Sequence, residues 1–254
     1  MPIIFFPNDD GLAHVNSELP FTFLGGPHIS ALLITAVFCV AVWPVAKHLA
    51  LNGWAQHFGK TLAVFLVGYE CLKITLYVGV FKMPLLYHLP LHLCDVNMLL
   101  CAYMLARHSY RSYEVSYFWA MGGSVAAMLT PDLAYGFPHS VFIAFFLGHG
   151  LVVVSVLYAT FGYGFRPHLK SIAIAMSVTA LYAAVIMPLN FLLDTNYLYL
   201  RAKPLTPSVL DYLGPWPWYI VGLVGLCAAA CFITYAPFAL ARKMRGAGNQ
   251  GAMG

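Results

Sequence analysis

The chain is 254 residues long, 61% of its residues are hydrophobic, only 9% are charged, and its formal net charge is +4. With a mean hydropathy of +0.77, this composition leaves too few polar side chains to cover a water-soluble core, and it excludes a soluble globular domain. It predicts an integral membrane protein, and because the basic residues form no basic face on a water-soluble domain, it argues against nucleic-acid binding.

Residues 1–28 form the first predicted unit. This stretch is uncharged to acidic, with Asp9, Asp10 and Glu18, and it has neither the basic start nor the small-residue cleavage site that marks a signal peptide. We therefore expect it to remain in the mature protein as an external N-terminal segment.

Seven apolar stretches follow, and a window of about twenty residues predicts a membrane-spanning helix in each. They cover residues 29–46, 58–81, 89–105, 115–129, 141–161, 169–193 and 216–240. The fourth is the shortest and contains Gly122 and Gly123. The sequence thus predicts an all-α polytopic membrane protein, a bundle of seven transmembrane helices over residues 29–240, followed by a disordered tail over 241–254.

The distribution of Lys and Arg predicts how the chain crosses the bilayer, since cytoplasmic loops carry an excess of basic residues. With the C-terminus inside, the cytoplasmic side collects Lys47, Lys60, Arg107, Arg111, Arg166, Lys170, Arg242, Lys243 and Arg245, and the other side only Lys82, Arg201 and Lys203. This asymmetry favours an external N-terminus and a cytoplasmic C-terminus.

Polar side chains gather in the outer half of this predicted bundle, where an ionisable group is costly unless it faces the bundle interior or a wet cavity. Glu70 and Lys73 lie one helical turn apart in the second stretch, either as a structural ion pair or as part of a site. His149 lies between two glycines in the fifth stretch. Cys94 is one of six cysteines, all in apolar stretches and none in a CxxC spacing, so no disulfide framework is expected.

Cys94 and His149 form the first candidate catalytic pair. A thiol acts as a nucleophile through its thiolate, which needs a base or a positive field nearby. Pro90 suits the start of the third helix, whose N-terminal dipole would favour a thiolate or an oxyanion, with Asn97 as a further oxyanion donor. His149 lies at a comparable predicted depth and could supply the base. We therefore expect the third and fifth helices to be neighbours, with the sulfur and a ring nitrogen within roughly 6 Å.

A metal set competes for the same segment. His88, His92 and Asp95 follow at positions i, i+4 and i+7, which would place two imidazoles and a carboxylate on one helix face. That face is turned away from Cys94, so mutations can separate the two hypotheses. Outside this alternative the sequence indicates no metal ligand and no cofactor.

Four segments carry a resemblance to a known family: "LPLHLCDVN", "YFWAMGGSVAAMLTPDL", "FPHSVFIAFFLGHG" and "LDTNYLYLRAKP". The chain resembles the YwaF-like family of bacterial integral membrane proteins. That family is similar to the animal transmembrane acyltransferases that place polyunsaturated chains on ether phospholipids. The resemblance implies a multi-pass protein of the bacterial inner (plasma) membrane.

The resemblance also implies roles for individual residues. In the animal acyltransferases the cysteine of the segment similar to "LPLHLCD" is the proposed nucleophile, which corresponds to Cys94. The histidine of the "HG" segment is its proposed partner, which corresponds to His149. Many relatives have a small polar residue just before that histidine, where this chain has Gly148.

Other polar residues of these segments are expected to bind substrate or to support the pair. Asp132, after the fourth stretch, could orient His149 or bind an ammonium head group, and Lys203 could bind a phosphate. The remaining members of this supporting set are Glu70, Lys73, His92, Asp95, Asn97, Asn190, Asp194, Asn196 and Tyr197.

Three functions follow from these candidates. The leading hypothesis is a lipid acyltransferase or transacylase that carries the acyl chain as a thioester on Cys94 and acts on phospholipid or another acyl lipid of the outer leaflet. The second is a heptahelical carrier or small-ligand binding protein whose polar cavity is lined by Glu70, Lys73, His149 and Asp194. The third is a metal-dependent lipid hydrolase. The acyl donor and acceptor and the oligomeric state are left open.

Overall fold

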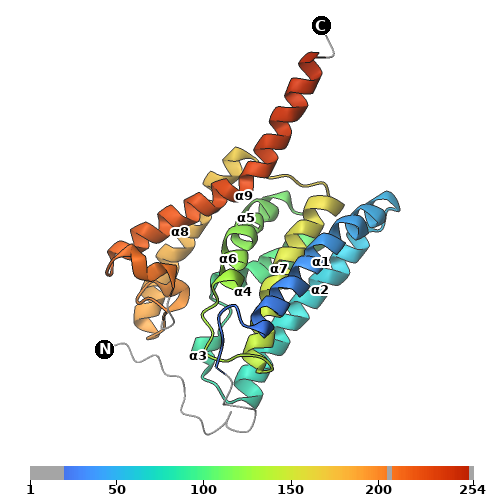
Figure 1. Cartoon of the computed structure of the whole chain (residues 1–254). Helices are drawn as coiled ribbons and strands as arrows, with labels where there is room; N and C mark the ends of the chain where they lie inside the picture. Colours follow the sequence, from blue (N-terminus) through green and yellow to red (C-terminus); the bar gives the residue numbers. More distant parts are fainter. Residues whose placement is uncertain (1–19, 205–207, 252–254) are drawn as a thin grey trace.

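The computed structural model describes residues 20–204 and 208–251, and within them the fold is all-helical, as predicted. The elements, drawn in Figure 1, are α1 (Gly26–Leu51), α2 (Ala55–Ile74), η1 (Thr75–Val80), α3 (Leu85–His88), α4 (Leu93–Arg107), α5 (Tyr110–Phe118), η2 (Trp119–Ser124), α6 (Val125–Leu129), α7 (Ser140–Gly162), α8 (Leu169–Leu192), η3 (Tyr197–Tyr199), η4 (Val209–Leu213) and α9 (Trp218–Gly251). The first 19 residues of the predicted N-terminal segment lie outside the described part.

Five helices among the described residues are long and apolar enough to cross a membrane. They are Gly26–Leu51, Ala55–Val80, Ser140–Gly162, Leu169–Leu192 and Trp218–Met244. They correspond to the first, second, fifth, sixth and seventh predicted stretches. The third and fourth stretches are helical but shorter or interrupted, so the predicted count of seven spans is not confirmed.

The third stretch becomes helical later than predicted because Pro90 and Leu91 form a turn between two extended residues. Leu89 has φ −60° and ψ 141°, His92 has φ −68° and ψ 149°, and the helix begins only at Leu93. Pro90 therefore precedes α4 and does not start it. The resulting helix has 15 residues, which is short for a bilayer crossing.

The fourth stretch begins earlier than predicted, at Tyr110, and consists of α5, the π-helical segment η2 and α6 in succession. Gly122 lies within η2, where an added Cβ would come within 3.3 Å of the Ala230 Cβ on α9. The absence of a side chain there lets α9 pack closely. Among the described residues, the π-helical segment η1 ends the α2 helix and η2 interrupts the helix formed by α5 and α6, and such segments are frequent near functional sites.

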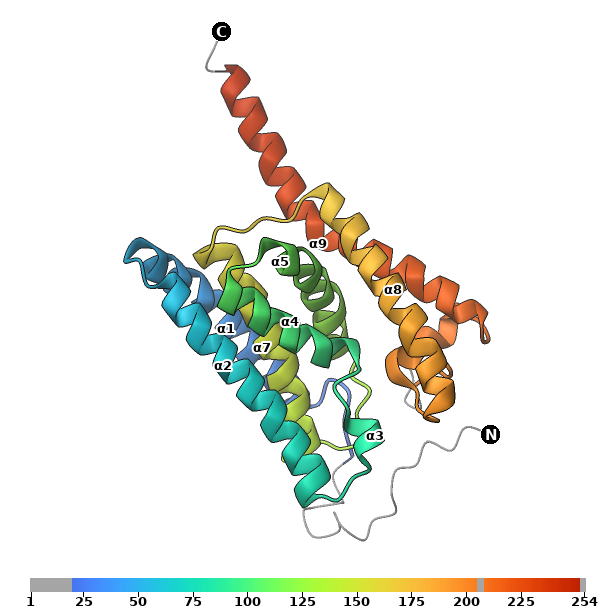
Figure 2. The ribbon, with the colours of Figure 1, turned by 180° about the vertical axis from the view of Figure 1, so that it is seen from behind.

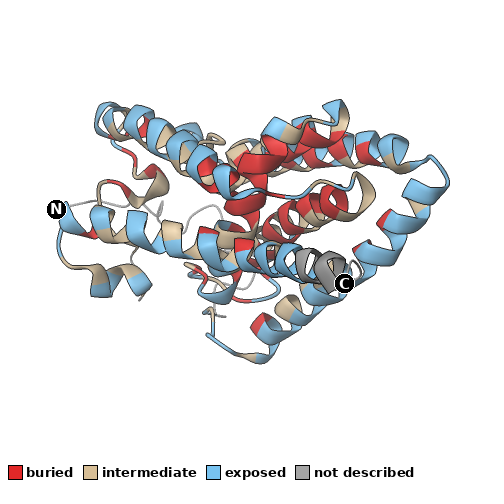
Figure 3. Cartoon of the chain, turned by 90° about the horizontal axis from the view of Figure 1, so that it is seen from above, coloured by how far each residue is buried: buried red, intermediate tan, exposed pale blue. Residues whose placement is uncertain are grey.

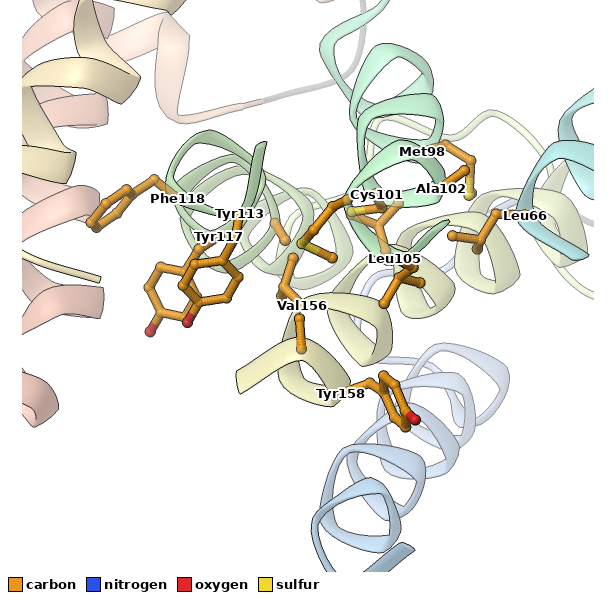
Figure 4. Close-up of a cluster of buried hydrophobic side chains, with 14 of the residues drawn as sticks. Leu66, Met98, Cys101, Ala102, Leu105, Tyr113, Tyr117, Phe118, Val156 and Tyr158 are labelled. Carbon is orange, nitrogen blue, oxygen red and sulfur yellow. The ribbon is translucent and has the colours of Figure 1, made fainter. Parts of the chain in front are cut away.

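The inner helices are α4, α5 and α7. α7 packs against α1 and α4, while α4 lies between α2 on one side and α5 on the other (Figure 2). Buried positions, drawn red in Figure 3, gather in the interior of the bundle, and exposed positions lie mostly on its outer helices. The exposed large hydrophobic residues of the described part lie mostly on α1, α2, α8 and α9. Side chains from α2, α4, α5 and α7 interlock in the largest core cluster, which includes Leu66, Leu105, Tyr113 and Val156 (Figure 4).

α9 runs on past the predicted end of the last span. Ala241, Arg242, Lys243 and Met244 are good helix formers, and the helix continues to Gly251, projecting beyond the other helices (Figure 1). The prediction of a disordered tail is therefore wrong for residues 241–251, and residues 252–254 lie outside the described part.

Candidate functional site

The two residues of the predicted pair meet at the N-terminal end of α4. Cys94 is the second residue of α4 and is half-buried, and His149 lies in the middle of α7 and is buried. The helices pack against each other, and the His149 Nε2 atom lies 3.2 Å from the Cys94 sulfur. The predicted neighbourhood of the two helices, and the approach of the sulfur and a ring nitrogen, are confirmed.

The second ring nitrogen fixes the direction of this contact. His149 Nδ1 lies 2.8 Å from the carbonyl oxygen of Phe145, one turn earlier on α7. A carbonyl oxygen can only accept, so we assign the proton of a neutral ring to Nδ1. Nε2 then carries the lone pair and accepts from the Cys94 thiol. The imidazole is thus oriented as a base toward the sulfur.

The start of α4 adds a positive field to the pair. His92 is the N-cap residue, and no side chain caps this end of the helix. The first N–H groups of a helix lack intrahelical partners and carry a partial positive charge. Cys94 is the second helical residue and so belongs to this first turn, where the field favours a thiolate or an oxyanion.

Three ionisable residues lie beside Cys94. The Lys73 ammonium contacts Glu70 on its own helix, with Nζ 2.8 Å from Oε1, so the two side chains of the predicted pair are in contact. It also donates to Asp95 on α4, with Nζ 2.6 Å from Oδ1. Asp95 follows Cys94 directly, so this contact ties α2 to the α4 turn that carries the thiol.

Aromatic residues border His92 from the connection between α8 and α9. The His92 ring centroid lies 4.9 Å from that of Tyr197 and 6.3 Å from that of Tyr199. The Tyr199 hydroxyl donates to Asp132 Oδ2 at 2.8 Å. Burial, and then the neighbouring carboxylate, hold the pKa of Tyr199 above its ordinary value, so its hydroxyl stays protonated at neutral pH.

Tyr199 and Phe145 are the residues that sequence reasoning missed. Tyr199 follows Leu198, and both have left-handed backbone conformations, with φ of 53° and 59°. Such conformations are uncommon for large side chains and are maintained by the surrounding structure. Two consecutive residues with this conformation form the turn that brings Tyr199 to Asp132. No side-chain pattern in the sequence predicts such a turn.

Four predicted supporting residues fold the connection between α8 and α9. Asn190 donates to the Tyr197 carbonyl at 2.9 Å, and Asn196 donates to the Ala202 carbonyl at 2.9 Å. Lys203 donates to the Asp211 carbonyl at 3.3 Å. Asp194 pairs with Arg201, and its side chain is 82% exposed. In this structure these polar groups bond within the connection.

Asn97 also bonds away from the pair. Its amide nitrogen donates to the Ser116 carbonyl on α5 at 3.3 Å, and its amide oxygen accepts from the Cys101 thiol at 3.8 Å. The N–H groups at the start of α4 are therefore better placed than Asn97 to hold an oxyanion near Cys94.

The predicted metal face does not form. His88 ends α3, the backbone is extended at Leu89, and α4 begins only after His92, so the positions i, i+4 and i+7 do not share one helix. Within the described part of the chain, no group of three or more His, Cys, Asp or Glu side chains is placed to hold a metal ion. Asp95 is paired with Lys73.

Gly148, where many relatives have a small polar residue, lies against Tyr69 of α2. A Cβ added there would lie 3.0 Å from the Tyr69 hydroxyl oxygen, which donates to the Ala144 carbonyl at 2.6 Å. We expect Gly148→Ser to displace that hydroxyl and to lower the free energy of unfolding by about 1 kcal/mol. Thermal unfolding of the purified protein measures the change.

The control is the same substitution in a Tyr69→Phe background, where no hydroxyl opposes the serine. The serine should cost less there than in the wild type. An equal loss in both backgrounds would show that Tyr69 does not limit the space at this position.

The fold and the site together define a class: a multi-pass, all-helical membrane protein whose inner helices bring a thiol and an imidazole into contact. The model of the TMEM164 family, a transmembrane family, matches residues 23–235, and the chain belongs to this family. The match includes both Cys94 and His149. No curated protein and no solved structure matches the chain.

Proposed function

We propose that this protein transfers an acyl chain between membrane lipids, with Cys94 as the nucleophile and His149 as the general base. The observation that carries the proposal is the 3.2 Å contact between the sulfur and Nε2, with the other ring nitrogen bound to a carbonyl. The resemblance of the surrounding segments to YwaF-like proteins, and through them to lipid acyltransferases, supports the same chemistry.

The residues suit a two-step reaction. In the first step the sulfur attacks the ester carbonyl of a donor lipid while the thiol proton passes to His149 Nε2. The carbon–sulfur bond forms, the ester carbon–oxygen bond breaks, and His149 returns the proton to the departing alcohol oxygen. In the second step an acceptor hydroxyl gives its proton to Nε2 and its oxygen attacks the thioester carbon. The new carbon–oxygen bond forms, the carbon–sulfur bond breaks, and His149 returns the proton to the sulfur. Hydrolysis would follow the same course with water as the acceptor.

The charges and N–H groups around Cys94 suit these two reaction steps. The N–H groups at the start of α4 can stabilise the tetrahedral oxyanion that forms at the carbon bonded to Cys94. Lys73 is held by Asp95, so its ammonium lies beside the same turn. The acyl lipid is the one partner that the proposal needs, and the reaction as drawn requires no cofactor.

The two alternative functions have less support from the geometry. The carrier hypothesis placed Asp194 in a cavity with Glu70, Lys73 and His149, but Asp194 is largely exposed and paired with Arg201. The hydrolase hypothesis needed its three ligands on one face of a single helix. The direct test between these functions is covalent capture of an acyl chain by the purified protein, argued in the Discussion.

We also propose that the Cys94 end of the bundle lies toward the outer leaflet of a bacterial plasma membrane, with the C-terminus in the cytoplasm. The support is the asymmetric distribution of basic residues. A reporter fused after Gly254 should therefore read as cytoplasmic, and one inserted near Pro204 as external. A cytoplasmic reading near Pro204 would place the site on the inner side.

A further inference from the structure

Glu70 stands out among the polar residues because it is buried without adequate partners. It lies near the C-terminal end of α2 and is only 2% exposed. One oxygen, Oε1, is within 2.8 Å of Lys73 Nζ, but neither oxygen receives a hydrogen bond of good geometry from the described residues. An ionised carboxylate in this position would be poorly stabilised, because a buried charge needs hydrogen bonds as well as a counter-ion.

Two charged groups in the described part of the chain face Glu70: Lys73 from α2 itself and Asp95 from α4. Two carboxyl groups therefore share one ammonium. If all three were ionised, this buried cluster would carry a net charge of about −1, which is costly inside a membrane protein.

The geometry assigns the negative charge to Asp95. Its contact with Lys73 is the shorter of the two, at 2.6 Å, and has hydrogen-bonding geometry. Asp95 is the third residue of α4, where the partial positive charge of a helix N-terminus stabilises a carboxylate. Its side chain is 21% exposed, against 3% for that of Glu70, so water can also solvate it. Glu70, near the C-terminal end of α2 and far from any helix N-terminus of its own, has none of these advantages.

We propose that Glu70 is a proton-binding site: its carboxyl group is protonated at neutral pH and becomes ionised only when Lys73 is released from Asp95. The charges around Cys94 then balance, because Lys73 and Asp95 form a neutral pair beside a neutral Glu70. The inference concerns this cluster alone and does not depend on acyl transfer at Cys94.

Infrared spectroscopy of the full-length protein in lipid nanodiscs tests the proposal directly, because protonated and ionised carboxyl groups absorb at different positions. At pH 7 the wild type should show a protonated-carboxyl band that Glu70→Gln lacks. Asp95→Asn should lose the same band, because Lys73, freed of Asp95, becomes available to pair with an ionised Glu70. A wild-type band that survives in Glu70→Gln would overturn the proposal, and so would one that survives in Asp95→Asn.

A second buried carboxyl group provides the matched control. Glu114 on α5 is 9% exposed and accepts from the Ser171 hydroxyl at 2.5 Å. In Glu114→Gln the Glu70 band should persist. The stability of Glu70→Gln is a second test, because glutamine matches a protonated glutamate in size and, like it, carries no charge. Glu70→Gln should therefore fold and melt near the wild-type temperature, and a variant that fails to fold would show that an ionised Glu70 is required.

Discussion

Cys94→Ala is expected to abolish covalent acyl capture, with a loss of at least about 10³-fold, because a group that forms the covalent intermediate cannot be replaced by its neighbours. Purified protein incubated with ester lipids should gain the mass of an acyl chain, and hydroxylamine, which cleaves thioesters, should remove it. Cys94→Ser should lose most of the capture as well, because a hydroxyl is a far weaker nucleophile than a thiol near neutral pH. Its near-equal volume should preserve the fold.

The chain contains a matched control for this experiment. Cys71 on α2 is an exposed thiol, so Cys71→Ala should leave acyl capture unchanged if reactivity depends on the histidine contact and not on exposure. His88→Ala should also have little effect. An acyl adduct that persists in Cys94→Ala would refute the role of this sulfur. Chelator-sensitive activity together with stoichiometric zinc would favour the metal-dependent hydrolase instead.

His149→Gln is expected to slow thioester formation by about 10²- to 10⁴-fold, the usual range for loss of a general base. Glutamine can still form a hydrogen bond near the sulfur, but it cannot accept the thiol proton at neutral pH. The rate at which Cys94 reacts with iodoacetamide should fall in parallel, since alkylation also requires the thiolate. Alkylation measured by mass spectrometry therefore reports on the base independently of any lipid substrate.

His28 allows loss of a base to be separated from loss of a buried histidine. It is 1% exposed, its Nδ1 accepts from the Leu24 amide at 3.1 Å, and its Nε2 bonds the Met128 carbonyl at 2.9 Å. His28→Ala should lower the free energy of unfolding by about 1–3 kcal/mol, while the alkylation rate of the folded protein stays unchanged. Equal alkylation rates in His149→Gln and the wild type would show that His149 does not activate the thiol.

The sequence was sufficient for the class of fold and for the two central residues of the candidate site. Long apolar runs predict helices because a backbone inside a bilayer must satisfy its hydrogen bonds within each segment. The five long helices match the predicted stretches for this reason. Cys94 and His149 were identifiable because a thiol and an imidazole are unusual in such apolar surroundings and because their segments resemble a known family.

Predictions from short sequence patterns were wrong where contacts with neighbouring segments set the backbone conformation or the hydrogen-bond partners. Pro90 predicted the start of a helix, but it lies in a turn and α4 begins only after His92, which removes the proposed metal face and shortens the third stretch. Asn190, Asn196 and Lys203 suited a head-group site by composition, yet they bond to backbone carbonyls of their own connection. A donor or acceptor in a sequence does not reveal which partner it will find.

Only the tertiary structure decided how the polar groups combine. Cys94 and His149 are 55 positions apart, and spans of similar depth can be neighbours or lie on opposite sides of a bundle. The packing of α4 against α7 brings the two together, and the Phe145 carbonyl sets the direction of their hydrogen bond. The packing of α2 against α4 pairs Lys73 with Asp95 and leaves Glu70 buried with little support. Helical periodicity fixes depth and face within one segment, whereas lateral contacts arise from side-chain packing between segments that are distant in the sequence.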